Sequence, residues 1–371
     1  MDRIRQVMGS LLKQEKFLLL AIFAAIIAYP LEHSLLSNGQ SVALMAGLVL
    51  VVAIICASMR VAHHAELLAE KVGDPYGTMI LTLAAVLVEV VILAIMMGNE
   101  ASPTLVRDTI YSAVMLDING ILGLAALMGG LKHGEQPYND DSARTYSVMI
   151  LTAVAVSMVV PEFVPESKWK LYSMFTIGAM VLLYTVFLRM QVGPHSYFFS
   201  YSYPQKQKPP PVHVVDEGAS VNQTRSISTL VLGVVVIGAL AEVMAKTINL
   251  GLEGSGAPPV LAAVLVATIS AAPEILTALR AALANRMQSV VNIALGASLS
   301  TVILTVPLME AMALYTGQPF HMAMTPVQTV MMFVTLLVSA INLNDGQTNA
   351  IEGMTHFVLF ATFIMLSLIG L

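Results

Sequence analysis

The sequence predicts an all-α polytopic membrane protein with about eleven transmembrane helices: one N-terminal helix followed by two five-helix repeats of inverted topology. Hydrophobic residues make up 57% of the 371 residues, and charged residues make up 11%. The mean hydropathy is +0.79. A soluble domain carries about 25% charged residues. The apolar residues are also gathered into long runs, which excludes an ordinary chain with an aqueous surface.

Eleven apolar runs follow one another along the chain, each near the length that crosses a bilayer, about 20 residues. Their bounds are Phe17–Leu36, Val42–Val61, Tyr76–Gly98, Arg107–Leu131, Tyr146–Phe163, Leu171–Gln191, Thr229–Leu250, Pro259–Ala282, Ser289–Leu314, Thr325–Ile341 and Gly353–Leu371. The single cysteine, Cys56, excludes an internal disulfide. The sequence holds no nucleotide-binding glycine loop, zinc motif or nucleophile elbow. We therefore expect neither a cofactor nor an enzymatic activity.

Positive charges orient these spans. When the N-terminus is placed in the cytoplasm, 14 of the 18 Lys and Arg residues fall in cytoplasmic segments and 4 in outer segments. Positive residues are enriched in cytoplasmic loops of membrane proteins, so the asymmetry favours this orientation. It also favours an odd number of spans, which would place the C-terminal Leu371 outside.

A polar, proline-containing interval divides the chain. We expect an N-terminal segment with the first helix at residues 1–39, a first repeat at 40–191, a cytoplasmic linker at 192–226 and a second repeat at 227–371. Five spans per half force the two halves into opposite orientations. The segment His64–Ala69 resembles Leu240–Ala245, and each precedes a central acid of its half.

The central acids are Glu89, within Tyr76–Gly98, and Glu274, within Pro259–Ala282. A charged side chain at the bilayer centre costs at least about 2.5–3.5 kcal/mol, so such acids usually mark an ion or proton path. The alternative interpretation is a protonated carboxyl that only hydrogen-bonds a neighbouring helix. Two acids at similar depth, one in each half, favour the ion path.

Two carboxylates in a low-dielectric site would bind cations and protons in competition. If the protein cannot easily switch its open side while the site is empty and unprotonated, exchange of one ion for the other becomes obligatory. Pro273 removes the helical donor of the Ile269 carbonyl, and we expect a helix break there that lines a cavity. A simple packing kink is the other interpretation of this proline.

Other polar side chains within the spans form a possible secondary site. They are Asp117, Asn119, Ser298, Ser300, Thr82 and Ser270, with Glu66 and Glu242 nearer the interfaces. Helical spacing puts Asp117 and Asn119 on different faces. For the hydroxyl residues, bonding to the helix backbone is the alternative, and for the two glutamates it is an interfacial charge. The adjacent histidines, His63 and His64, also favour an interfacial role.

Several of these residues carry a resemblance. The set Ala65-Glu66, Gly73-Asp74, Gly77 and Glu89, the loop Gly129-Gly130-Leu131, and the second-half motifs Ala272-Pro273-Glu274 and Ile293–Ser298 resemble cation/proton exchangers of the cation/calcium exchanger superfamily, nearest to the bacterial ChaA-type antiporters. The resemblance implies exchange of cytoplasmic calcium, sodium or potassium for protons. It also implies one essential glutamate per repeat at a shared central site, which would be the metal-binding pair Glu89 and Glu274, and a place in the bacterial inner membrane.

The chain departs from that family at the positions before each glutamate. The family often has Gly-Asn there, whereas this chain has Ala85-Val86 and Ser270-Ala271, and Ser300 replaces a glutamine. Calcium prefers six to eight oxygen ligands, so the lost amide oxygens give sodium or potassium more weight. Asp117 stands where the family typically has an uncharged Asn, and its carboxylate would partly replace the lost ligands.

The predicted function is secondary active antiport of these cations against protons by alternating access. The predicted partners are inorganic cations, protons and the lipid bilayer, with no nucleic acid. Two alternatives stay open: a passive cation channel that uses the same acids, and an intramembrane enzyme with Glu89 and Glu274 as an acid/base pair. The second alternative lacks a visible nucleophile or metal triad.

Overall fold

The computed structural model describes residues 14–72, 76–99, 102–193, 196–201, 223–253, 256, 258, 260–318 and 320–371. Within these ranges every predicted span is helical, which confirms the all-α class. Ten helical stretches are long and apolar enough to cross a membrane, and one shorter apolar helix joins them. The bounds are α2 Lys16–Ser37, α3 Gln40–Val72, α4 Tyr76–Asn99, α5 Leu105–Met115, α6 Gly123–His133, α7 Asp140–Val154, α8 Trp169–Val192, α9 Gln223–Leu252, α10 Val260–Leu283, α11 Met287–Ser300, α12 Val306–Thr316, α13 Pro326–Asn342 and α14 Ala350–Leu368.

The helices form two compact units, which we call unit 1 and unit 2. Unit 1 holds residues 1–101 and 221–257, and therefore α2, α3, α4 and α9. Unit 2 holds residues 102–220 and 258–371, with α5–α8 and α10–α14. Each half of the sequence contributes helices to both units. The units of packing therefore differ from the predicted sequence repeats, whose bounds stay a prediction.

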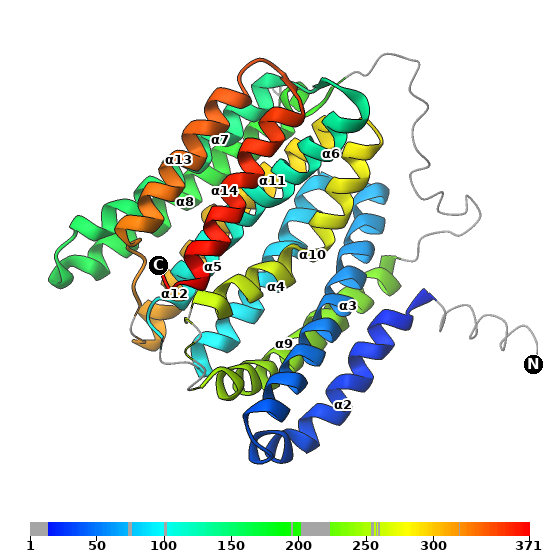
Figure 1. Ribbon diagram of the computed structural model, residues 1–371, viewed down its shortest axis with the longest axis vertical. Helices are drawn as coiled ribbons and strands as arrows, with labels where there is room; N and C mark the ends of the chain where they lie inside the picture. The colour runs from blue at the N-terminus through cyan, green and yellow to red at the C-terminus, as the bar shows by residue number, and fades with distance from the viewer. Residues whose placement is uncertain are drawn as a thin grey trace, which may run out of the picture. The chain divides into compact units, whose positions relative to one another are not determined.

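In unit 1, α3 and α9 lie antiparallel and very close together (Figure 1). Gly47 near the start of α3 faces Ile248 near the end of α9, where a Cβ would stand 2.6 Å from the isoleucine Cδ1. Gly251 faces Leu44 in the same way: a Cβ there would stand 2.7 Å from the Leu44 Cβ and 2.8 Å from its Cα. Small residues allow membrane helices to approach closely, so these glycines set the spacing of the pair. Helices α2 and α4 pack against both members.

In unit 2, each half contributes a long span that a π-helical turn divides into two α-helices. The turn η1 covers Leu116–Leu122 between α5 and α6, and η6 covers Thr301–Thr305 between α11 and α12. Turns of this kind are frequent at functional sites. The α5–α6 span ends beside the turn between α10 and α11, since Lys132 Nζ donates to the carbonyl of Leu283, the last residue of α10, at 2.9 Å. The two spans therefore run in opposite directions, as inverted repeats require.

The two ends of unit 2 are distinct. At the end that we call the Lys132 face, the short strands β1 (Gln136–Pro137) and β2 (Gln347–Thr348) pair antiparallel. At the other end, the Arg107 face, the His321 amide donates to the carbonyl of Pro103 at 2.8 Å. Side-chain caps begin several helices: Asn139 accepts from the Asp141 amide ahead of α7, Thr325 forms a capping box with Gln328 ahead of α13, and Asn349 accepts from the Ile351 amide ahead of α14.

Some local predictions need correction. Helix α3 continues to Val72, well past the predicted end at Val61. Helix α10 runs through Pro273 without interruption, which corrects the predicted helix break. The proline still lacks an N–H, so the Ile269 carbonyl loses its helical donor inside a continuous helix. Residues 202–222 of the predicted linker, and Gly73-Asp74 of the family motif, lie outside the described residues.

Candidate functional site

Glu89 is the buried acid of unit 1. It lies thirteen residues after the start of α4 and ten before its end, and only 3% of its surface is exposed. The helix that carries it packs against α3 and α9. Thr82 lies two helical turns earlier on the same face of α4 and is half-buried. Unit 1 therefore places one carboxylate and one hydroxyl along a single helix face, deep within a membrane span.

Glu274 is the corresponding acid of unit 2. It is half-buried on α10, the residue after Pro273. One turn earlier, Ser270 Oγ donates to the carbonyl of Ala267 at 3.0 Å. This bond to the helix backbone agrees with the alternative interpretation of Ser270, a structural hydroxyl. The same stretch of α10 therefore offers a carboxylate and, at Ile269, a backbone carbonyl without its usual donor.

Asp117 lies on the π-helical turn η1 and is 2% exposed. Its Oδ2 accepts a hydrogen bond of 3.2 Å from Ser298 Oγ on α11. Helix α10, which carries Glu274, packs against both η1 and α11. The contact therefore joins one predicted site residue from each half of the sequence inside unit 2.

Asn119 points away from Asp117, as helical spacing predicts. Its Nδ2 donates to Thr335 Oγ1 at 2.7 Å, and its Oδ1 lies 2.9 Å from His356 Nδ1. These partners belong to α13 and α14, so Asn119 ties those helices to η1. Ser300 Oγ donates to the carbonyl of Ala297 at 2.9 Å, within its own helix. Asn119 and Ser300 are thus engaged in structural contacts.

Glu66 is exposed and Glu242 is half-buried, so neither is buried as Glu89 is. The Glu66 side chain is 48% exposed and lies 3.9 Å from His63 Nδ1. The Glu242 side chain is 36% exposed and pairs with Lys246 Nζ at 3.1 Å. Tyr29 Oη also donates to Glu242, at 2.7 Å. Both carboxylates are engaged by neighbouring polar groups, and their assignment as interfacial charges stays a prediction.

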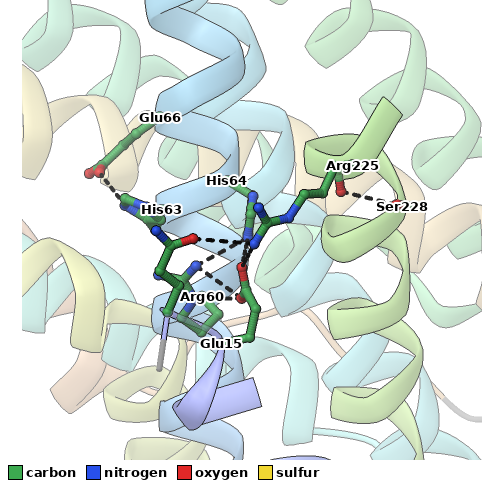
Figure 2. Close-up of polar contacts among 8 residues, drawn as sticks. Glu15, Arg60, His63, His64, Glu66, Arg225 and Ser228 are labelled. Carbon is green, nitrogen blue, oxygen red and sulfur yellow. Dashed lines mark hydrogen bonds and ion pairs between the residues drawn. The ribbon is translucent and has the colours of Figure 1, made fainter. Parts of the chain in front are cut away.

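Figure 2 shows a second ion cluster of unit 1 beside Glu66. Glu15, just before α2, accepts from Arg60 of α3 at 2.9 Å and from Arg225 of α9 at 3.1 Å. Its Oε1 lies 3.2 Å from Nε2 of the buried His64. Burial raises the pKa of Glu15, but the attraction of Arg60 and His64 outweighs it and leaves the pKa below its ordinary value. The cluster fastens α2 to both α3 and α9.

Sequence reasoning missed three buried polar groups of unit 2. Arg107 pairs with Asp108 at 2.8 Å, and Gln328 Nε2 donates to the same carboxylate at 2.9 Å. His356 is 2% exposed on α14, and Glu310 is 2% exposed on α12. Glu310 was detectable, because it is an acid inside the predicted span Ser289–Leu314. His356 has no formal charge when neutral, so a search for charged residues inside the predicted spans would not find it.

A cation held by these residues would rely on few protein ligands. Within the described ranges, no three His, Cys, Asp or Glu side chains group closely enough to hold a metal ion. Carboxylates, serine and threonine hydroxyls, backbone carbonyls and water remain as oxygen donors. Such a shell suits a weakly held, exchangeable cation better than a resident metal.

Comparison with known proteins gives consistent matches. A family model described as "Sodium/calcium exchanger protein" matches residues 41–193 and 225–369. The sodium-potassium/proton antiporter ChaA of Escherichia coli K12 is 30% identical over 331 residues, covering 89% of this chain and 90% of the relative. The Ca(2+)/H(+) antiporter ChaA of Bacillus subtilis 168 is 25% identical over 278 residues, covering 73% and 76%.

A solved structure has the same fold. The structure of native YfkE superimposes with a TM-score of 0.73, covering 95% of this chain and 99% of that one, at 20% sequence identity.

Proposed function

Because the chain belongs to the sodium/calcium exchanger protein family, we propose that it is a secondary active antiporter that exports cytoplasmic cations in exchange for protons by alternating access. The observation that carries the proposal is the pair of acids at the same stage of the two halves. Glu89 lies within the second span of the first half and Glu274 within the second span of the second half. Each carboxylate would bind a cation or a proton, but not both at once, because both compete for the same oxygens.

Sodium and potassium are the proposed main substrates. The chain has Ala85-Val86 and Ser270-Ala271 before its two acids, so no side-chain amide oxygen precedes either glutamate there. A calcium ion would need several more oxygens from backbone and water to reach its usual six to eight. The relative that is 30% identical is named a sodium-potassium/proton antiporter, which supports the same preference.

The protein is an integral membrane protein, and we propose that the Lys132 face of unit 2 is cytoplasmic. The ends of the spans at this face carry Lys132, Arg144, Arg189, Arg280 and Arg286. The Arg107 face carries Arg107, Lys168 and Lys170. The excess at the Lys132 face follows the positive-inside rule, and the inner membrane of a bacterium would provide the proton gradient.

The deciding experiment is flux in proteoliposomes. Purified protein is reconstituted, a proton gradient is imposed as the sole energy source, and sodium, potassium or calcium uptake is measured against its own gradient. An antiporter moves at least one of these cations uphill and collapses the proton gradient in proportion. A purely downhill flux would indicate a channel, and no cation movement under any condition would overturn the proposed function.

A further inference from the structure

Glu310 is a buried acid that the proposed exchange does not use. It lies on α12 and is 2% exposed. It lies six positions before Thr316, the last residue of the helix, which is about 9 Å along the axis. The surrounding stretch Met287–Thr316 is one of the spans long and apolar enough to cross a membrane. Glu310 therefore lies inside the span but near its end at the Arg107 face.

The contacts of Glu310 leave one carboxyl oxygen unsatisfied. Ser173 of α8, the helix that packs along α12, brings its hydroxyl close to the carboxylate, where it favours the charged form. The other oxygen, Oε2, has no hydrogen-bond partner among the described residues. The neighbouring Tyr172 cannot supply one, because its hydroxyl donates to the carbonyl of Val156 at 2.6 Å.

No described side chain compensates the charge of Glu310. Lys168 just before α8 and Lys170 near its start are exposed, and so are Glu162 and Glu166. The turn η6, which also packs against α12, brings the uncharged Thr301 and Thr305. Helix α5, which packs against η6, brings Arg107 and Asp108, and these two pair with each other.

An uncompensated carboxylate at this burial is expensive, so the neutral form is favoured when the site is dry. The neutral acid, however, still leaves Oε2 without a hydrogen-bond partner, as donor or as acceptor, and an unmade buried hydrogen bond costs about 1–3 kcal/mol. Neither protonation state is fully satisfied. The hydroxyl of Ser173 nevertheless stabilises the charged form, so the free-energy gap between the two states is reduced.

We propose that Glu310 is a further proton-binding residue of the exchanger, which takes up and releases a proton at the Arg107 face. The inference rests on the proposed proton-coupled exchange. The step is a simple protonation: one proton adds to the carboxylate and leaves from the same oxygen, with no other bond changed. The position of Glu310 about two helical turns from the end of α12 gives the proton a short route to water.

A structural role makes different predictions. A permanently neutral acid that only binds Ser173 is closely mimicked by an amide of the same shape. Glu310→Gln should then leave exchange and its pH profile unchanged. If Glu310 exchanges protons, the same variant keeps exchange through Glu89 and Glu274 but shifts the pH midpoint by about one unit, or flattens the profile.

The test combines two readouts on reconstituted full-length protein. Infrared difference spectra follow the carbonyl stretch of protonated carboxyl groups during a pH titration, and flux gives the pH profile of exchange. We expect Glu310→Gln to remove one pH-dependent carboxyl band and to change the pH profile. Ser173→Ala should move the midpoint of that band to higher pH, because the lost hydroxyl had stabilised the charged carboxylate. The exposed acid Glu162 supplies a matched control, and Glu162→Gln should change neither readout.

Two outcomes would overturn the proposal: a Glu310 carboxyl band that does not change over the pH range of exchange, or a Glu310→Gln variant with the pH profile of the wild type. If Glu310→Gln fails to fold, Glu310→Asp is used instead, because it keeps a titratable group. If the pH midpoint of the carboxyl band in Glu310→Asp is the same as in the wild type, the band does not come from residue 310, and this result counts against the proposal. The infrared titration does not depend on transport, so a protein without any exchange would fail the proposed function while Glu310 could still be tested.

Discussion

Ser298 of α11 donates a 3.2 Å hydrogen bond to Asp117 on the π-helical turn η1. The two residues are buried and come from opposite halves of the sequence, 181 positions apart. A hydroxyl that donates to a carboxylate stabilises the charged form of that carboxylate. A charged Asp117 beside α10 would strengthen cation binding in unit 2, whereas a protonated Asp117 would serve only as a helix contact.

Asp117→Asn distinguishes these roles. The amide keeps the size of the side chain and can accept from Ser298, so the fold should be retained. We expect a loss of affinity for the preferred cation of about tenfold, the effect of about 1.4 kcal/mol, or a shifted pH optimum. Flux measured against cation concentration and pH provides both values. Ser298→Ala should have a smaller effect in the same direction, and unchanged affinity, selectivity and pH profile in Asp117→Asn would exclude Asp117 from the ion path.

Glu89→Gln and Glu274→Gln should each abolish exchange while folded protein remains in the membrane. Glutamine keeps size and hydrogen bonding but can neither release a proton nor supply a charge for a cation. Flux in proteoliposomes measures the loss of exchange, and thermal unfolding of the detergent-solubilised protein measures whether the fold is retained. The exposed Glu166 on unit 2 is a control acid, and Glu166→Gln should transport normally. Near-normal proton-driven flux in either central variant would make that glutamate a structural, protonated residue.

The close approach of α3 and α9 makes Gly251 sensitive to any larger side chain. A Cβ at Gly251 would stand 2.7–2.9 Å from atoms of Leu44, including its backbone. We expect Gly251→Val to destabilise the protein by about 1–3 kcal/mol through overpacking. Gly178 on α8 is the matched control, because a Cβ there meets no atom within 4 Å. Gly178→Ala should be neutral or stabilising by up to about 1 kcal/mol. Thermal unfolding of both variants decides, and equal stability would show that α3 and α9 can separate at little cost.

Much of the fold could be predicted because membrane spans depend on composition and length. The ends of helices could not, since they depend on contacts. Helix α3 continues through its polar end, where Arg60 and His64 bind Glu15 from another part of the chain. The grouping of α4 with α3 and α9, and of α10 with unit 2, also depends on contacts between distant segments. No local apolar pattern encodes such partners.

The site shows a similar division. Acids in apolar runs are conspicuous, so Glu89, Glu274 and Asp117 could be singled out from sequence. The π-helical turn that carries Asp117 could not, because one extra residue per turn leaves the apolar run unchanged. Glu310 is also a buried acid within an apolar run, as Glu89 is, but it lies outside the motifs that the two halves share.

Topology can be tested with single cysteines. The charge asymmetry predicts that the linker near Pro210 is cytoplasmic and that Leu371 is external. On a background in which Cys56 is replaced, a cysteine at each position is labelled with a membrane-impermeant reagent from one side at a time. We expect the linker to react from the cytoplasmic side and the C-terminus from the other side. Reaction of both positions from one side would contradict an odd number of spans and the inverted repeat.

The last prediction concerns the ion cluster around Glu15. The pKa of Glu15 lies below its ordinary value near 4.5, because Arg60 and His64 outweigh the effect of burial. A carboxylate with a lowered pKa stabilises the folded state above its unfolded pKa, and this stabilisation is lost as the pH falls through the lower, folded value. Glu15→Gln keeps a hydrogen-bond acceptor but removes the charge that Arg60 and Arg225 contact.

At neutral pH, Glu15→Gln should therefore lower stability by about 1.5–3 kcal/mol, the usual contribution of hydrogen bonds to charged groups. The deficit should shrink as the pH falls below about 4.5 and vanish below the lower, folded pKa, where the carboxyl of the folded wild type is protonated as well. Thermal unfolding in detergent across this pH range measures both effects. The exposed Glu253, at the end of α9, provides the control substitution Glu253→Gln, which should be neutral at every pH. A deficit of constant size from neutral to acid pH would show that Glu15 acts through packing, and not through its charge.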